Sequence, residues 1–399
     1  MPGIALNRGI AMPRVSRYKP LPGVIATRTY MPDGISDGIQ TSGTYRWQHS
    51  SPLNSRISNI QLVFINWYQN ATNEVDGAQN ITVKAALDDN SAVYPVYFKG
   101  ARSVVIEPGG MAISDPMGVD IAAATLFYTR TFVSVGGAGQ TWPLTAAGGT
   151  LSGFNEGNTA GAPGTDLTNV GSGAVTTVTA GGYGPVAILG NQENLLPSLA
   201  LIGDSITRGT NTVRDSVGNQ GYPAMWAQNK VNGYLNLGKG SWRCNYDGIL
   251  ERRRRRLGLL QACNITHALL QSGINDVTNG RSNAQIQADM LAIANALVGI
   301  GVKPYIATIT PSSTSTDGWV TVVNQTTHAN NAVRVANNNW RRTLPAPFKG
   351  LVEVADLAES ARDSGLWKAS YTGDGLHPLV GGAAAIAAAL PSPLDYFRV

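Results

Sequence analysis

Residues 198–205 read SLALIGDS, an apolar run that stops abruptly at a glycine, an acid and a serine. A short apolar run bounded by turn residues is typical of a buried strand. The segments that follow alternate between strand-like and helix-like patterns, which favours a parallel sheet. Open sheets of this kind bind ligands outside the carboxyl ends of their strands. Ser205 is therefore predicted to lie at the ligand-binding edge of a sheet.

The chain beyond about residue 191 continues this alternation. The predicted elements are strands at Ala268–Gln271, Pro304–Ile309 and Gly350–Leu357, a helix with Ile286, Met290, Ile293 and Leu297 on one face, and an alanine-rich helix at Gly382–Leu390. Strands separated by helices build βαβ units, in which helices cover both faces of the sheet. We therefore predict a three-layer α/β/α domain with a parallel sheet, and assign it residues 193–399.

The preceding part of the chain has a different pattern. Short runs rich in Val, Ile, Tyr, Phe and Thr are separated by Gly, Asn, Asp and Pro clusters, and no helical period interrupts them. The predicted strands are Ile60–Tyr68, Ile81–Leu87, Ala92–Phe98, Ala122–Val135 and Ala174–Ala180. This pattern indicates an all-β sandwich or jelly roll over residues 36–192, with long loops at 136–173 and an N-terminal arm at 1–35.

Composition agrees with two domains and narrows the class. The chain has 399 residues, enough for two hydrophobic cores, and only 14% of them are charged. This balance favours an extracellular, surface or virion protein, although no Sec signal peptide is visible and the compartment stays open. Five of the 30 basic residues form one run, Arg252–Arg256, so the basic surplus does not indicate a nucleic-acid partner. No apolar window is long enough to predict a membrane span.

Four polar groups in the C-terminal half supply what ester hydrolysis by serine requires: a hydroxyl, a base, a group that orients the base and a donor for the oxyanion. Ser205 is the candidate nucleophile. Asp374 and His377 lie three residues apart, so that the carboxylate can fix the tautomer and orientation of the imidazole. Asn275 follows another strand end, and its amide can donate to an oxyanion at the same edge.

The blocks Gly203-Asp-Ser, Asn236-Leu-Gly-Lys-Gly-Ser, Gly273-Ile-Asn-Asp and Asp374-Gly-Leu-His resemble, in order, the signature of the SGNH (GDSL-type) hydrolase family. The resemblance covers about residues 196–390 and implies a flavodoxin-like fold and serine esterase activity. By this resemblance Ser205 is the nucleophile, His377 the general base and acid, and Asp374 its partner. It implies an oxyanion hole made by Ser205, the second block and Asn275, and neither a metal nor a cofactor.

The second block departs from the family pattern. The family places a glycine at the position that aligns with Ser241, whereas this chain has Gly240 one residue earlier. Because a backbone N–H can donate from either residue, we assign the second oxyanion donor to Gly240 and keep Ser241 as the alternative.

Other conspicuous residues are interpreted as structural. Gly34–Gly38 matches the G-x-S-x-G pattern but lacks the strand and helix that should flank it, so it is interpreted as a turn. His267 and His328 have no acid at the Asp374–His377 spacing.

The Arg252–Arg256 run is expected on a helix that begins near Asp247, solvated or paired with acids, with an anion-binding patch as the alternative. Cys244 and Cys263 are expected to be buried thiols, with one disulfide as the alternative. Four tryptophans, at positions 242, 319, 340 and 367, are expected in the core, with a role as platforms for sugar rings or acyl chains as the alternative.

The expected function is hydrolysis of short-chain esters, acetyl esters above all, on a carbohydrate. An alternative is a lipid or polyester esterase, which would need an apolar acyl channel formed by the loops after Pro311 and around Trp319. An alternative of another class is a surface or virion protein whose β domain binds a glycan and whose hydrolase domain is incidental or trims that receptor. The glycan assignment rests on analogy between β-sandwich modules alone.

Overall fold

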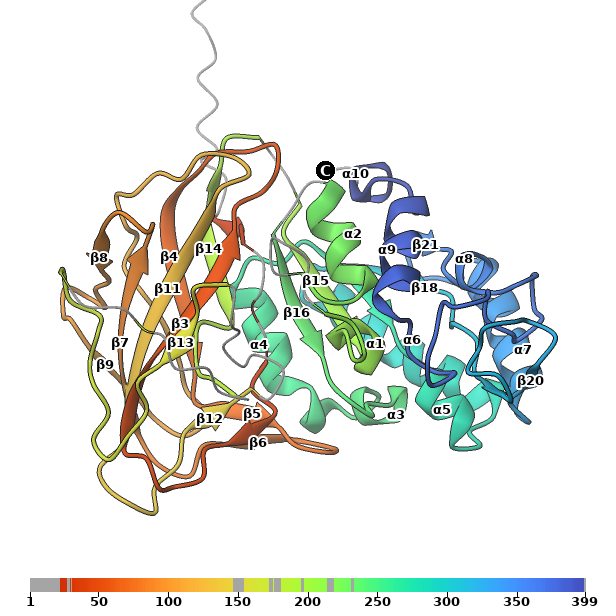
Figure 1. Cartoon of the computed structure of the whole chain (residues 1–399), viewed down its shortest axis with the longest axis horizontal. Helices are drawn as coiled ribbons and strands as arrows, with labels where there is room; N and C mark the ends of the chain where they lie inside the picture. Colours follow the sequence, from red (N-terminus) through yellow and green to blue (C-terminus); the bar gives the residue numbers. More distant parts are fainter. Residues whose placement is uncertain are drawn as a thin grey trace, which may run out of the picture.

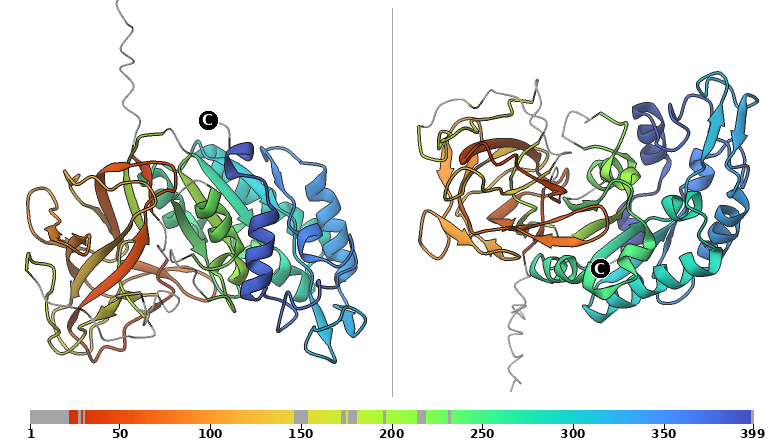
Figure 2. Two further views of the ribbon diagram at one scale, coloured as in Figure 1. Left: turned by 45° about the horizontal axis from the view of Figure 1, so that its top comes forward. Right: turned by 90° about the horizontal axis from the view of Figure 1, so that it is seen from below.

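The computed structural model describes residues 22–26, 29, 31–145, 154–171, 175, 181–194, 197–213, 219–230 and 233–397. Within these residues a β-rich region and an α/β domain lie side by side (Figures 1 and 2). The expected strand at Ala174–Ala180 falls almost entirely outside the described residues.

Two large antiparallel sheets form most of the β-rich region of the described chain. One contains, in order, β1 (Gly23–Val24), β14 (Ala187–Gln192), β4 (Ile57–Ile65) and β10 (Met111–Ile113). The other contains β13 (Gly157–Asn158), β3 (Ser42–Ser50), β11 (Leu126–Ser134), β7 (Ile81–Asp88) and β8 (Val93–Pro95), with β9 (Val104–Ile106) also paired to β7. Inner residues of both sheets share one core, which confirms the predicted sandwich.

In the four-stranded sheet, the last four residues of β4 are buried on both faces. Along β4, Leu62 and Phe64 point into the core of the sandwich, whereas Val63 and Ile65 belong to the core of the α/β domain. This division follows from the period of two along a strand, and it explains why β4 ends in the unbroken apolar run 62–65. The two regions therefore meet through packed apolar side chains.

Several short elements lie where loops or an arm were expected. β1 falls within the predicted N-terminal arm, yet it pairs with β14. β2 (Gly34–Ile35) pairs with β12 (Pro143–Leu144), and β5 (Trp67–Gln69) pairs with β6 (Glu74–Asp76). The Gly34–Gly38 segment is thus a strand end followed by a turn, in which the Ser36 hydroxyl accepts a hydrogen bond from the Trp142 N–H over 3.1 Å.

The α/β domain has a parallel sheet in the order β16 (Tyr234–Gly238), β15 (Leu199–Gly203), β17 (His267–Gln271), β18 (Lys303–Ala307) and β21 (Leu351–Val352) within the described residues. Numbered along the chain this is 2-1-3-4-5, the flavodoxin-like order, which confirms the predicted fold. Its helices are α1 (Ser205–Arg208), α2 (Tyr222–Lys230), α3 (Cys244–Asp247), α4 (Arg254–Ala262), α5 (Ile274–Thr278), α6 (Asn283–Gly299), α7 (Asn331–Arg342), α8 (Ala355–Ala358), α9 (Val380–Ala389) and α10 (Pro393–Tyr396).

Helix α6 buries Ile286, Met290, Ile293 and Leu297, as the periodicity predicted. The predicted strand at Gly350–Leu357 was wrong beyond Val352. The N–H groups of Val354 and Ala355 donate to the Thr308 hydroxyl, each over 2.8 Å, so the chain leaves the sheet there and enters α8. The alanine-rich helix is present as α9.

The prediction of a helix that begins near Asp247 was also wrong. Asp247 ends α3, a short 3₁₀ helix η1 (Leu250–Arg252) follows, and α4 begins only at Arg254. Cys244 and Cys263 are buried free thiols, which confirms the favoured interpretation. Trp242 and Trp367 are fully buried, whereas Trp319 and Trp340 are only partly buried against the core.

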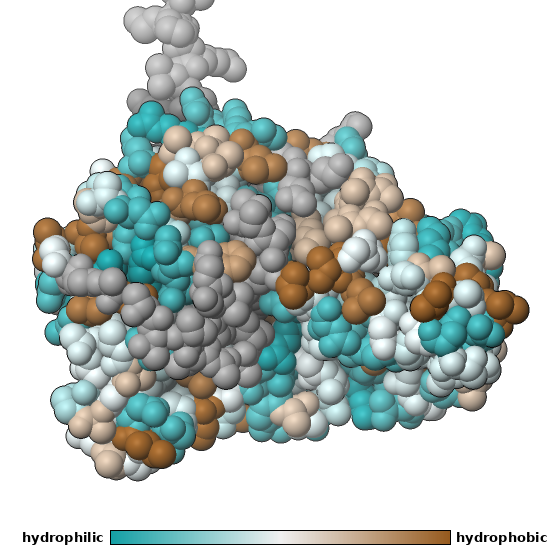
Figure 3. Space-filling model, in the orientation of Figure 1, coloured by the Kyte–Doolittle hydropathy of each residue, from teal (hydrophilic) through white to brown (hydrophobic). Residues whose placement is uncertain are grey.

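No helix of the described residues is long and apolar enough to cross a membrane. On the face shown in Figure 3 the most hydrophobic residues form small separate groups among hydrophilic ones.

Candidate active site

The local sequence places Ser205 at a helix N-terminus. β15 ends at Gly203, Asp204 is the N-cap, and its Oδ1 accepts a hydrogen bond from the Ile206 N–H over 2.9 Å. Ser205 is the first residue of α1, and N–H groups at this position have no partner within the helix. The side chain of Ser205 is buried against the domain but reaches the edge of the sheet where the strands end.

Ser205, His377 and Asp374 form one chain of hydrogen bonds. His377 Nε2 lies 2.7 Å from Ser205 Oγ, and His377 Nδ1 lies 2.6 Å from Asp374 Oδ2. The other carboxylate oxygen of Asp374 accepts from the backbone N–H groups of Leu376 and His377, over 2.9 and 2.8 Å. The structure thus brings together the three residues that the sequence singled out.

The charge on Asp374 is held by its hydrogen bonds. Burial opposes ionisation, but the bonds from the His377 ring and from the N–H groups of His377 and Leu376 outweigh it and keep the pKa of Asp374 well below its usual range. Asp374 is therefore an anion throughout the neutral range and favours the His377 tautomer whose Nδ1 carries the proton.

Two residues that the sequence did not single out support this pair. The Asn211 side-chain amide donates to Asp374 Oδ2 over 2.7 Å. The Thr372 hydroxyl donates to the His377 carbonyl over 2.7 Å and accepts from the Gly375 N–H over 3.0 Å, which closes the Asp374–His377 turn. Thr372 lies two residues before Asp374, a spacing at which threonine often bonds nearby backbone. Asn211 carries no such local signal.

The second block forms a turn directly after β16. The Lys239 N–H donates to the Gly203 carbonyl over 3.1 Å, and the Trp242 N–H donates back to the Lys239 carbonyl over 3.2 Å. Gly240 and Ser241 are the central residues, and among the described residues neither of their N–H groups has an acceptor. Ser241 has φ +61°, a conformation that favours glycine. We call residues 239–242 the oxyanion turn.

Asn275 lies at the start of α5. Its Nδ2 donates to the Trp242 carbonyl over 2.9 Å, which fixes the orientation of the amide and leaves its second N–H available. His267, in contrast, is the first residue of β17 at the opposite edge of the sheet, where its ring packs at a tilt against Tyr305 and Phe397. Burial lowers the pKa of His267 to about 4, so this ring is neutral. Among the described residues, no cluster of three or more His, Cys, Asp or Glu side chains could hold a metal ion.

Asp204 is fully buried, and its Oδ2 has no hydrogen-bond partner among the described residues. Burial raises the pKa of Asp204 to about 7, compared with about 3.9 in an unfolded chain. The stability that this group contributes is therefore complete below about pH 4 and is lost as the pH rises through 7.

Asp204→Asn keeps the N-cap acceptor and removes the buried charge. We expect its free energy of unfolding to exceed that of the wild type by about 1–4 kcal/mol at pH 8 and to match it at pH 4. Urea denaturation at both pH values measures the difference. If the two proteins differed in free energy of unfolding by the same amount at pH 4 and pH 8, the raised pKa of Asp204 would be contradicted.

An open parallel α/β sheet that carries a Ser–His–Asp chain at the carboxyl ends of its strands defines a serine hydrolase. Residues 201–385 match the model of the GDSL-like lipase/acylhydrolase family. This C-terminal domain is therefore a GDSL-like acylhydrolase domain, that of an ester hydrolase of the SGNH type.

Solved structures similar to the chain include several relatives of this class. One is a lipolytic protein of the G-D-S-L family from Veillonella parvula, 16% identical, which covers 50% of this chain and 98% of its own with a TM-score of 0.38. Another is a putative acylhydrolase from Bacteroides fragilis, 16% identical, with 48% and 82% covered and a TM-score of 0.34. A third is a carbohydrate acetylesterase from Sinorhizobium meliloti, 16% identical, with 48% and 95% covered and a TM-score of 0.35. No curated protein matches the sequence.

Proposed function

We propose that the protein removes short acyl groups, acetyl above all, from a carbohydrate, with Ser205 as nucleophile, His377 as general base and acid, and Asp374 as the partner of His377. The observation that carries this proposal is the unbroken chain from Ser205 Oγ through the His377 ring to Asp374 Oδ2, with distances of 2.7 and 2.6 Å.

Catalysis then proceeds in two acyl transfers. Ser205 Oγ attacks the ester carbonyl while its proton passes to His377 Nε2, and the tetrahedral intermediate collapses as His377 returns that proton to the leaving alcohol. Water attacks the resulting acyl-enzyme, His377 takes a proton from it, and the carboxylic acid leaves as Ser205 regains its hydrogen. Asp374 stabilises the imidazolium form in both halves.

The oxyanion of each tetrahedral intermediate would accept from the Ser205 N–H, from an N–H of the oxyanion turn at Gly240 or Ser241, and from Asn275 Nδ2. Among the described residues none of these backbone N–H groups has an acceptor, and Asn275 Nδ2 retains a second hydrogen. Fixed donors of this kind stabilise developing charge without reorganising during the reaction.

Asn275→Ala removes one of these donors. We expect kcat to fall about 10²–10³-fold with KM nearly unchanged, because the bond forms only in the transition state. Steady-state kinetics with p-nitrophenyl acetate measure the effects on kcat and on KM separately. A rise in KM at constant kcat would show that Asn275 binds the substrate rather than the oxyanion.

The surroundings of the site favour a hydroxyl-rich alcohol. Asn211 is exposed and donates to Asp374, and the side chains of Arg208 beside the oxyanion turn and of Lys239 within it are 20% and 13% exposed. Hydrogen-bonding and charged groups suit the hydroxyls of a sugar better than an alkyl chain.

One observation favours the alternative of a lipid or polyester substrate. The ring of Trp319 lies against Gly375, so the loop that carries Trp319 borders the Asp374–His377 turn. Val320 and Val323 on the same loop are 62% and 87% exposed. An acyl chain could lie along this loop.

Hydrolysis of p-nitrophenyl acetate, butyrate and decanoate, together with acetate release from acetylated xylan and pectin, separates these functions. We expect preference for acetate and release of acetate from at least one polysaccharide. Preference for decanoate would support the lipid alternative. Absence of Ser205-dependent turnover, with glycan binding retained, would support a glycan-binding protein with an incidental hydrolase domain.

A further inference from the structure

Helix α4 takes its N-terminal cap from the β-rich region. Arg253, at the N-cap position, makes no capping side-chain bond. Instead, Glu74 on β6 accepts from the Arg255 N–H over 2.7 Å and from the Arg256 N–H over 3.1 Å. A carboxylate at this position satisfies unpaired N–H groups and complements the positive end of the helix dipole. In the ribbon, α4 lies at the junction of the two regions (Figure 1).

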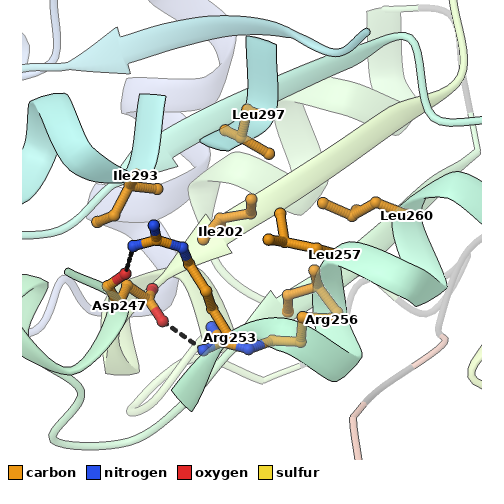
Figure 4. Close-up of a pocket in the computed structure, with 9 residues that line it drawn as sticks. Ile202, Asp247, Arg253, Arg256, Leu257, Leu260, Ile293 and Leu297 are labelled. Atoms are coloured by element: carbon orange, nitrogen blue, oxygen red, sulfur yellow. Dashed lines mark hydrogen bonds and ion pairs between the residues drawn. The ribbon is translucent and has the colours of Figure 1, made fainter. Parts of the chain in front are cut away.

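The same carboxylate holds the Arg256 side chain. Arg256 Nε lies 2.9 Å from Glu74 Oε1, with side chains only 5% and 2% exposed. Arg256 Nη2 also pairs with Asp247, the contact drawn in Figure 4 beside a small cavity under α4. Arg256 is therefore fixed between an acid from each region.

Arg256 in turn contacts the oxyanion turn. Its guanidinium lies 4.9 Å from the centre of the Trp242 ring, which is fully buried and packs edge-on against Tyr246. The Trp242 carbonyl accepts from Asn275 Nδ2. A continuous series of contacts thus runs from Glu74 through Arg256 and Trp242 to Asn275.

A second acid from the β-rich region contacts the other end of the turn. Asp33 Oδ2 lies 2.8 Å from Arg208 Nη2 and 3.7 Å from Lys239 Nζ. Arg208 ends the helix that Ser205 begins, and its guanidinium lies so close to Gly240 that a methyl group there would be 3.2 Å from Nη1. Asp33 therefore holds the start of the oxyanion turn while Glu74 holds its end.

We propose that Glu74 and Asp33 are positioning residues for ester hydrolysis, and that the β-rich region completes the oxyanion hole by holding residues 239–242 from both ends. This inference rests on the proposed role of the turn in binding the oxyanion. Attachment of the two regions alone does not require these acids, because Val63 and Ile65 already pack into the core of the α/β domain.

The test compares Glu74→Gln with Asp76→Asn in the full chain. Asp76 lies on the same strand and pairs with Arg255, but it is 47% exposed, and within the described part of the chain it makes no hydrogen bond or ion pair with residues 239–242. Wild type and Ser205→Ala are assayed first, so that a missing esterase activity is recognised before the variants are compared. The readouts are kcat, KM and the inhibition constant of phenylboronic acid, whose tetrahedral serine adduct places an oxygen in the oxyanion hole.

For Glu74→Gln we expect kcat to fall about 10–100-fold, phenylboronic acid to bind more weakly by a similar factor, and KM to stay within about threefold. Asp76→Asn should change each value less than twofold. The proposal would be overturned if folded Glu74→Gln had the kcat and boronate affinity of the wild type, or if only its KM changed.

Glu74→Gln replaces the charged partner of a buried arginine and of two helix N–H groups with a neutral amide, so the variant can lose its fold. In that case Asp33→Asn, which alters the more exposed end of the turn, tests the proposal. A parallel loss of kcat and boronate affinity in the folded variant supports the proposal, and unchanged values overturn it.

Discussion

Ser205→Ala is expected to lower kcat for p-nitrophenyl acetate by about 10³–10⁶-fold while the protein stays folded. The hydroxyl is the atom that forms the acyl-enzyme, and His377 Nε2 is already 2.7 Å from it. Alanine keeps the backbone N–H at the start of α1, so the remaining rate would come from the oxyanion hole and substrate binding. Steady-state kinetics and circular dichroism give both quantities.

A second result should accompany this loss. Wild type mixed rapidly with excess ester should release a burst of p-nitrophenol equal to the enzyme concentration if deacylation is slower than acylation, and Ser205→Ala should show none. Residual turnover of Ser205→Ala within tenfold of wild type would exclude Ser205 as the nucleophile.

Asp374→Asn is expected to lower kcat by about 10⁴-fold, the effect of presenting the wrong histidine tautomer. Asn can still accept from the N–H groups of Leu376 and His377, so the turn should keep its shape. Its amide would face His377 Nδ1 with hydrogens in place of a carboxylate oxygen, which also removes the charge that stabilises the imidazolium. The measurement is kcat across pH 5–9.

Asn211→Ala is the matched control, because Asn211 donates to the same carboxylate oxygen as the ring. The loss of one hydrogen bond should cost about 1 kcal/mol, or about fivefold in kcat. If the two variants lost activity equally, the role of Asp374 would be packing rather than control of the His377 proton.

The fold of the α/β domain could be predicted largely from local patterns. The run at β15 and the period of α6 both reflect burial of neighbouring residues, which periodicity detects. β21 was overestimated because the Thr308 hydroxyl ends it, and that contact joins residues far apart in sequence. The helix boundary near the arginine run failed for the same reason, since the cap of α4 is Glu74.

The candidate site was predictable to the extent that it depends on short motifs. Asp374 and His377 lie three residues apart and follow the order of the family signature. The contacts of Asn211, Arg256 and Asp33 depend on which loops the fold brings together, and no local pattern encodes them. The arginine run was expected to be solvated or paired with acids, and Arg255 and Arg256 pair with Asp76 and Glu74. The sequence did not indicate that these ion pairs join the two regions.

The sheet of β1, β14, β4 and β10 bears on how the chain matures on the ribosome. Its last strand in sequence, β14, ends at Gln192, so the sheet cannot close until that residue has emerged. Val63, Ile65, Ala187 and Leu189 then face solvent until the first strands of the parallel sheet follow, because their packing partners are encoded later. During part of synthesis the nascent β-rich region therefore exposes an apolar, aggregation-prone surface. This surface is covered only after the hydrolase domain has been synthesised.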